Sequence, residues 1–167
     1  MIPGLFLDLD GVLADMDGFY QHLFGTRPER EQHLAPHEIE AMWAPVQRYP
    51  GRFFFDMPLT VDALVLWNGA RRLHPAPAIL TGVPRATTIP SAEADKRAWV
   101  AKYLGADVPV FTCRAKDKRL HGKPGDVLVD DWPRFQRRWE RMGGIFVLHT
   151  SAADSLARLA ELFGPTP

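Results

Sequence analysis

The stretch that decides the fold class of this chain is Gly4-Leu-Phe-Leu-Asp-Leu-Asp-Gly-Val-Leu-Ala-Asp15. Residues 4–9 form an apolar run without helical period, which is typical of a central strand in a parallel sheet. The run contains Asp8 near its end and is followed directly by Asp10 and Gly11. This stretch raises the question of why a buried strand should end in two carboxylates and a glycine.

Strands and helices are expected to alternate along the rest of the chain. Apolar runs predict four more strands, within residues 76–82, 108–112, 126–131 and 144–150. Helical patterns are found within residues 61–73, 91–105, 133–144 and 151–164. On the first of these helices one face carries Val61, Leu64, Val65 and Leu73. Alternating strands and helices imply right-handed crossovers, so we predict an α/β fold with a Rossmann-like parallel sheet.

Residues 16–56 differ in character from the rest, because they are rich in aromatic residues, histidine and proline and show no buried-strand pattern before Phe53. Thr26 and Glu29 fit the ends of a capping box, which predicts a helix that starts near Thr26. Pro36 is expected in the first turn of a second short helix. We therefore expect residues 16–56 to be a small helical insertion after the first strand.

Composition limits the classes of function. The 167 residues suggest one domain with an insertion, and 46% hydrophobic residues suffice for a packed core. The 20 basic and 20 acidic side chains give no overall field that would attract nucleic acid or a membrane surface. No apolar run approaches the length of a membrane span, and Asp8 makes the N-terminus a poor signal peptide. With the single Cys113, these features fit a cytoplasmic protein.

Polar residues are expected to meet at the carboxyl ends of the strands, where open parallel sheets form their sites. The strand ends carry Asp8 and Asp10, Thr81, Thr112, and Asp130 with Asp131. Taken singly, each aspartate pair is more often a turn former or a helix cap. Taken together, four carboxylates in one volume would repel one another, and a hard cation such as Mg²⁺ would relieve that repulsion.

The order of these residues resembles that of the haloacid dehalogenase (HAD) superfamily. "DLDGVLAD" resembles its motif I, "ILTG" its motif II, Lys96 its motif III and "VLVDD" its motif IV. The segments "FFFDMPLTVDAL", "DKRAWVAKYLG" and "VFTCRAKDK" are similar to those of the 5'(3')-deoxyribonucleotidases, which are HAD phosphatases that act on nucleoside monophosphates. The resemblance implies a HAD core domain made of residues 1–15 and 57–167, with residues 16–56 as a small helical cap.

The resemblance also implies a mechanism. Asp8 would be the nucleophile that forms an aspartyl-phosphate, and Asp10 would act first as general acid and then as general base. Mg²⁺ would bind Asp8, the carbonyl of Asp10, and Asp130 or Asp131. The hydroxyl of Thr81, the amide of Gly82 and the ammonium of Lys96 would hold the phosphate.

Substrate contacts are expected from the cap and from the loop that follows the third strand. Where the nucleotidases carry an aromatic that stacks on the base, this chain has Met16; Phe19, Tyr20, Trp43 and Phe53 could replace that platform, although such aromatics more often pack a cap. The loop within residues 113–126 is either a solvated loop or a clamp for a phosphate or nucleotide, with Arg114 and Lys118 as candidates. Lys118 or Lys123 is an alternative to Lys96 as the motif III lysine.

The sequence thus predicts a Mg²⁺-dependent phosphomonoester hydrolase, with a nucleoside monophosphate as the leading small phosphorylated substrate. A sugar phosphate and a 3'-phosphorylated nucleic-acid end are alternatives within the same chemistry, although the neutral charge argues against a stable nucleic-acid partner. A non-catalytic binding protein on a HAD scaffold is the alternative outside it. Such a protein should lack the nucleophile or the metal aspartates, and here all four aspartates are present.

Overall fold

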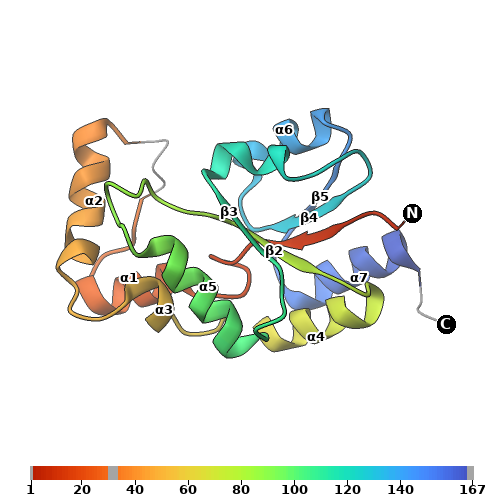
Figure 1. Cartoon of the computed structure of the whole chain (residues 1–167), viewed down its shortest axis with the longest axis horizontal. Coiled ribbons are helices and arrows are strands. Elements are labelled where there is room, and N and C mark those ends of the chain that lie inside the picture. Colours follow the sequence, from red (N-terminus) through yellow and green to blue (C-terminus); the bar gives the residue numbers. More distant parts are fainter. Residues whose placement is uncertain (1, 30–33, 165–167) are drawn as a thin grey trace.

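The computed structural model describes residues 2–29 and 34–164 of the chain. Its centre is one five-stranded sheet in which every strand is parallel to its neighbours (Figure 1). In spatial order β3-β2-β1-β4-β5, the strands are Val110–Cys113, Ala78–Gly82, Leu5–Leu7, Val127–Asp130 and Ile145–Leu148. The α/β fold predicted from the sequence is therefore confirmed.

The two faces of the sheet carry different helices. Leu5 and Leu7 of β1 point to a large core, whereas Phe6 points to a smaller core on the other face, as the two-residue period of a strand requires. The large core is covered by α4 (Ala63–Leu73), α5 (Ala92–Tyr103) and α7 (Ala152–Phe163). The smaller core is closed by Trp139 of α6 (Gln136–Arg141), which follows the 3-10 turn η3 (Pro133–Phe135).

The prediction of which face of α4 is buried is wrong. Val61 and Val65 are exposed, and so is Leu64, whereas the helix buries Leu66 and Trp67 against the core. The helix begins at Ala63 and packs on α7 and the sheet, so the buried face is rotated from the one that the apolar residues suggested. The helices predicted within residues 91–105, 133–144 and 151–164 lie where the sequence placed them.

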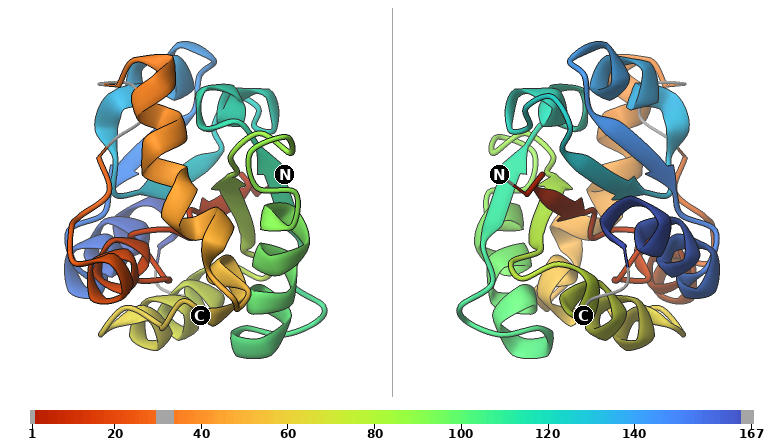
Figure 2. Two further views of the ribbon diagram at one scale, coloured as in Figure 1. Left: turned by 90° about the vertical axis from the view of Figure 1, so that its left-hand side faces the viewer. Right: turned by 90° about the vertical axis from the view of Figure 1, so that its right-hand side faces the viewer.

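Within residues 16–29 and 34–56 the chain forms helices beyond the carboxyl ends of the strands (Figures 1 and 2). These helices are α1 (Met16–Phe24), α2 (Pro36–Arg48) and the short α3 (Phe53–Asp56). The helix predicted to start at Thr26 is absent from the described residues, because α1 begins ten residues earlier, capped by Asp15, and ends at Gly25 in a left-handed conformation. The start of α2 at Pro36 is confirmed.

The two ends of this helical segment are joined at its base. The amide of Asp15 donates to the carbonyl of Pro58 (2.9 Å), and the amide of Thr60 donates to the carbonyl of Leu13 (2.9 Å). The hydroxyl of Thr60 adds a bond to the carbonyl of Val12 (3.0 Å). The segment therefore leaves and rejoins the sheet domain at one place, next to the turn that follows β1.

No helix among the described residues is long and apolar enough to cross a membrane.

Candidate active site

The floor of the site is the turn that follows β1. Asp8 and Asp10 both face a cavity at the carboxyl edge of the sheet, while Leu9 between them is fully buried in the core. Gly11 has a φ of 77°, and a Cβ at this position would meet a carboxylate oxygen of Asp131 at 2.3 Å. Only glycine permits both this backbone conformation and the close approach of the second aspartate pair.

Three carboxylates meet at this floor, with one oxygen from each of Asp8, Asp130 and Asp131 within 4.8 Å of the others. Carboxylate oxygens from few residues, supplemented by water and phosphate, are the ligand set that Mg²⁺ takes in proteins. The residues present therefore fit a Mg²⁺ ion. The side chain of Asp10 is not part of the group, and metal binding by its backbone carbonyl stays a prediction.

Lys118 lies between two of these carboxylates. The turn η2 (Ala115–Leu120) follows β3 and directs the Lys118 ammonium back under the strand ends, 2.9 Å from Asp8 Oδ2 and 2.7 Å from Asp130 Oδ2. The segment is thus an ordered 3-10 turn, and Lys118, not Lys96, contacts the expected nucleophile. Burial favours the neutral amine, but the attraction of Asp8 and Asp130 outweighs it and raises the pKa of Lys118 above 10.5, its ordinary value.

Lys96 contacts Asp10, the other aspartate of the turn. Its side chain is fully buried, and the ammonium donates to Asp10 Oδ2 (2.5 Å), Thr81 Oγ1 (3.1 Å) and the Gly82 carbonyl (2.6 Å). Lys96 is not among the residues that line the cavity. It therefore fixes the position of Asp10 from behind, although the sequence suggested that it would hold phosphate.

The pKa values of two carboxyls are shifted in the same direction. Burial raises the pKa of Asp10 above its ordinary value, Lys96 opposes the rise and Asp8 adds to it. Burial also raises the pKa of Asp130, against the attraction of Lys118. Asp10 Oδ1 is buried and has no hydrogen-bond partner among the described residues. A carboxyl that keeps its proton to higher pH and has an unengaged oxygen is suited to donate that proton.

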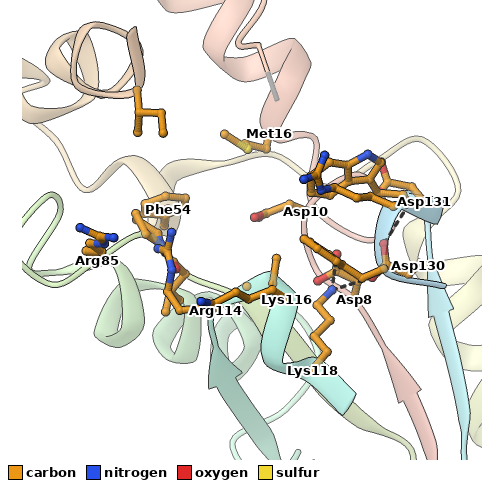
Figure 3. A pocket seen from close by; sticks show the side chains of 18 of the residues that line it. Asp8, Asp10, Met16, Phe54, Arg85, Arg114, Lys116, Lys118, Asp130 and Asp131 are labelled. Carbon is orange, nitrogen blue, oxygen red and sulfur yellow. Dashed lines mark hydrogen bonds and ion pairs between the residues drawn. The ribbon is translucent and has the colours of Figure 1, made fainter. Parts of the chain in front are cut away.

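A cavity of about 540 Å³ opens above this floor, between the strand ends and the helical segment (Figure 3). Such a volume is in the range of small-molecule sites. Its lining contains the four aspartates of the floor and, from the helical segment, Met16, Trp43 and Phe54. Basic side chains also line it, namely Arg85, Arg114, Lys116, Lys118 and Arg134.

Several phosphate and substrate residues expected from the sequence lie at this cavity, and others, including Tyr20, Phe53 and Lys96, do not. Met16, Trp43, Arg114 and Lys118 line it, as does Gly82. Phe19 is not among the lining residues and packs instead against Tyr49 and Phe53, with ring centroids 6.2 and 5.4 Å away. The Thr81 side chain is fully buried and accepts a bond from Lys96, so its hydroxyl belongs to the support of Asp10.

Sequence reasoning missed other lining residues. Phe54 was hidden among three consecutive phenylalanines, of which only Phe54 reaches the cavity. Arg85 follows the "ILTG" strand end, and Trp132 and Phe135 follow the second aspartate pair. The rings of Trp132 and Phe135 meet edge to face with centroids 5.5 Å apart. The available signal for Arg85, Trp132 and Phe135 was their proximity to a motif, since each lies within five residues of "ILTG" or "VLVDD".

Cys113 is not an activated thiol. It is half-buried at the end of β3, and burial raises its pKa to about 11. The thiolate is therefore scarce near neutral pH, and Cys113 takes no part in the chemistry derived from this site.

Comparison with known proteins gives one distant similarity. No family model matches the chain. The chain is similar to the mitochondrial 5'(3')-deoxyribonucleotidase of Homo sapiens, with 26% identity over 145 residues that cover 76% of this chain and 61% of the human protein. It thus spans about three fifths of the length of that relative. Distant similarity to a nucleotidase, over most of this chain, is what the comparison establishes.

Proposed function

We propose that this chain is a Mg²⁺-dependent phosphomonoesterase that works through an aspartyl-phosphate and acts on nucleoside monophosphates. The observation that carries the proposal is the floor of the cavity, where Asp8 lies with Asp130 and Asp131 within 4.8 Å and Lys96 holds Asp10 beside them. The distant similarity to a nucleotidase supports the same chemistry.

In the first step, a carboxylate oxygen of Asp8 attacks the phosphorus atom, and the bond between phosphorus and the ester oxygen breaks. Asp10 gives its proton to the departing alkoxide. In the second step Asp10, now a carboxylate, takes a proton from water as the water oxygen attacks phosphorus, which releases inorganic phosphate and restores Asp8. Lys118 offsets negative charge next to Asp8 while this happens.

Mg²⁺ would be held by Asp8, Asp130, Asp131 and the backbone carbonyl of Asp10. When bound, it would neutralise charge on the phosphate so that the anionic nucleophile can approach. The amide of Gly82, at the end of β2, is the remaining candidate from the sequence for a phosphate contact, since Gly82 lines the cavity.

The nucleoside monophosphate assignment rests on the aromatic lining of the cavity. Trp43 and Phe54 reach it from residues 16–56, which we assign as the cap, and Trp132 and Phe135 reach it from the core made of residues 1–15 and 57–167. Stacking of a base on aromatic rings contributes about 1–3 kcal/mol per base and tolerates different bases. These rings supply the platform that Met16 lacks.

Phosphate release tests the proposal. The panel is nucleoside 5'- and 3'-monophosphates, sugar phosphates and an aryl phosphate, each with Mg²⁺ and with chelator. We expect preferential turnover of nucleotides, its loss on chelation, and a decrease of about 10⁴-fold or more in Asp8→Asn. Turnover of the aryl phosphate alone would support a phosphatase but contradict the assignment of nucleotides as substrates. Wild-type rates in Asp8→Asn would refute the assignment of Asp8 as nucleophile.

A further inference from the structure

The guanidinium of Arg134 lies over the Phe135 ring, 5.4 Å from its centroid, and the other basic residues that line the cavity fall into two sets. Lys118 is paired with the carboxylates of the floor. Arg85, Arg114 and the ammonium of Lys116 gather on the side of the cavity away from Asp8, Asp130 and Asp131 (Figure 3). The cavity therefore has a carboxylate end that suits a cation and a phosphate, and a basic end that the chemistry described above does not use.

The basic end is built from two segments that are bonded to each other. Arg85 lies in the turn after β2, where its carbonyl accepts bonds from Thr88 (2.8 Å) and Ile89 (3.1 Å). Arg114 precedes η2, and its Nη1 donates to the carbonyl of Val83 (2.7 Å). That bond holds the guanidinium at the cavity wall, close to the turn that carries Arg85.

The helical segment also supports this end. Gln47 of α2 donates through Nε2 to the carbonyl of Thr88 (2.9 Å), in the same turn as Arg85. The turn is therefore bonded both to the sheet domain and to the segment that covers the cavity, which limits how far Arg85 can move from the opening.

Two of the three cations at this end, Arg85 and Lys116, are not balanced by a carboxylate within the described part of the chain. No carboxylate of residues 2–29 or 34–164 forms an ion pair with Arg85 or Lys116. Glu29 lines the cavity as well, and among the described residues it is the one acidic lining residue outside the four aspartates of the floor. Clustered cations on the wall of a concave site repel one another and raise the local concentration of anions.

We propose that Arg85, Arg114 and Lys116 bind a second phosphate group, carried by the leaving group of the substrate. The inference rests on the proposed function, because it takes the carboxylate end as the place of the scissile phosphate. A phosphate monoester has close to two negative charges and several acceptor oxygens at neutral pH, and arginine binds such groups through two parallel hydrogen bonds. The substrate class is therefore a bisphosphorylated molecule, of which a nucleoside 3',5'-bisphosphate is the representative.

Binding measured without turnover tests this assignment. The protein is Asp8→Asn with Mg²⁺ at low salt, and the ligands are thymidine 5'-monophosphate, thymidine 3',5'-bisphosphate and 3'-O-succinylthymidine 5'-monophosphate. We expect calorimetry to give an affinity for the bisphosphate about tenfold higher than for the monophosphate, with a smaller gain for the succinyl ester. If the succinyl ester gained as much affinity as the bisphosphate, the basic end would bind any anionic group, and the phosphate assignment would be overturned.

Variants locate the effect. In Asp8→Asn combined with Arg85→Gln and Lys116→Gln, the affinity for the bisphosphate divided by that for the monophosphate should fall to about one. Arg119 lies on η2 like Lys116 but does not line the cavity. Arg119→Gln removes one positive charge from η2, as Lys116→Gln does, and should leave this ratio unchanged. A ratio near one in the parent protein, or one that survives the double substitution, would overturn the inference.

Turnover in the wild-type protein separates this inference from the proposed function. If monophosphates are hydrolysed and the affinity ratio is near one, the second phosphate site is wrong and the phosphatase stands. If no ester is hydrolysed but the bisphosphate binds with the expected dependence on Arg85 and Lys116, the proposed function is wrong and the binding site stands. If there is neither turnover nor preferential binding, both are wrong.

Discussion

Two buried lysines form ion pairs with the aspartates of the turn that follows β1, and they differ in what they contact. Lys118 lines the cavity and contacts Asp8 and Asp130, so its charge can interact with a substrate bound there. Lys96 has no exposed surface, does not line the cavity and bonds to Asp10, Thr81 and Gly82.

The difference shows how one sheet edge gives two carboxylates different roles. Asp8 shares a cation with Asp130 next to further carboxylates, which suits a charged nucleophile beside a metal ion. Asp10 is bonded to its own lysine, and burial still raises its pKa. Pairs of acids whose surroundings differ in this way commonly divide the tasks of nucleophile and proton donor.

Of the two lysine variants, Lys118→Met is expected to have the larger effect. The substitution removes charge compensation from Asp8 and Asp130 and should lower kcat/KM for a nucleoside monophosphate by about 10²–10³-fold. Without Mg²⁺ it should also lower the free energy of unfolding, by about 3 kcal/mol, because two buried carboxylates lose their partner. Steady-state kinetics and urea unfolding measure the two effects. Arg119→Met, on the same turn, is the control, and a loss of activity equal in both variants would contradict the assignment.

Lys96→Met should act mainly on the pH dependence. Lys96 lowers the pKa of Asp10 against the rise due to burial, so its removal should raise that pKa further. The limb of the pH–rate profile that Asp10 sets should therefore move to higher pH, by about one unit, and kcat should fall by about tenfold. Profiles of kcat between pH 5 and 9 measure the shift. A loss of activity with an unmoved profile would show that Lys96 does not act through Asp10.

A smaller effect is expected from Arg52→Gln, which tests the support behind Lys96. Arg52 Nε donates to Asp95 Oδ1 (2.8 Å), and Asp95 is almost fully buried next to Lys96 on α5. Loss of this bond should lower the free energy of unfolding by about 1–2 kcal/mol and leave the pH profile in place.

Arg158→Gln provides the comparison for Arg52→Gln. Arg158 pairs with the exposed Glu161 three residues further along α7, and such pairs contribute about 0.5 kcal/mol or less. Urea unfolding of the two variants should rank them in that order. A shift of the pH profile in Arg52→Gln would instead mean that the ion pair at Asp95 controls the position of Lys96.

The strands were predictable because each is a short apolar run with a polar residue at its end. Parallel topology then brought Asp8, Asp130 and Asp131 together, although about 120 residues separate them in the sequence. The roles of the two lysines were not predictable, since both follow strand ends. What distinguishes them is the 3-10 turn η2, which directs Lys118 back under the sheet edge and does not follow from residue type.

Side chains in the helical segment were the least predictable. Phe19, Tyr20, Phe24, Phe53 and Phe54 are equally suited to core packing and to a binding site. The structure brings only Phe54 of this set to the cavity. Which ring faces outward depends on the packing of α1 against α3, and the start of α1 at Met16 differs from the start near Thr26 that the sequence suggested.

The closed base of the helical segment, where Asp15 meets Pro58 and Leu13 meets Thr60, has a consequence for how such a protein can change over time. Because the two ends are already joined, a longer or shorter segment between them adds little cost of loop closure. The segment can therefore vary while the turn with Asp8 and Asp10 keeps its geometry. Selection for a new substrate can act on residues 16–56, and a graft from another protein could be attached at the same joint.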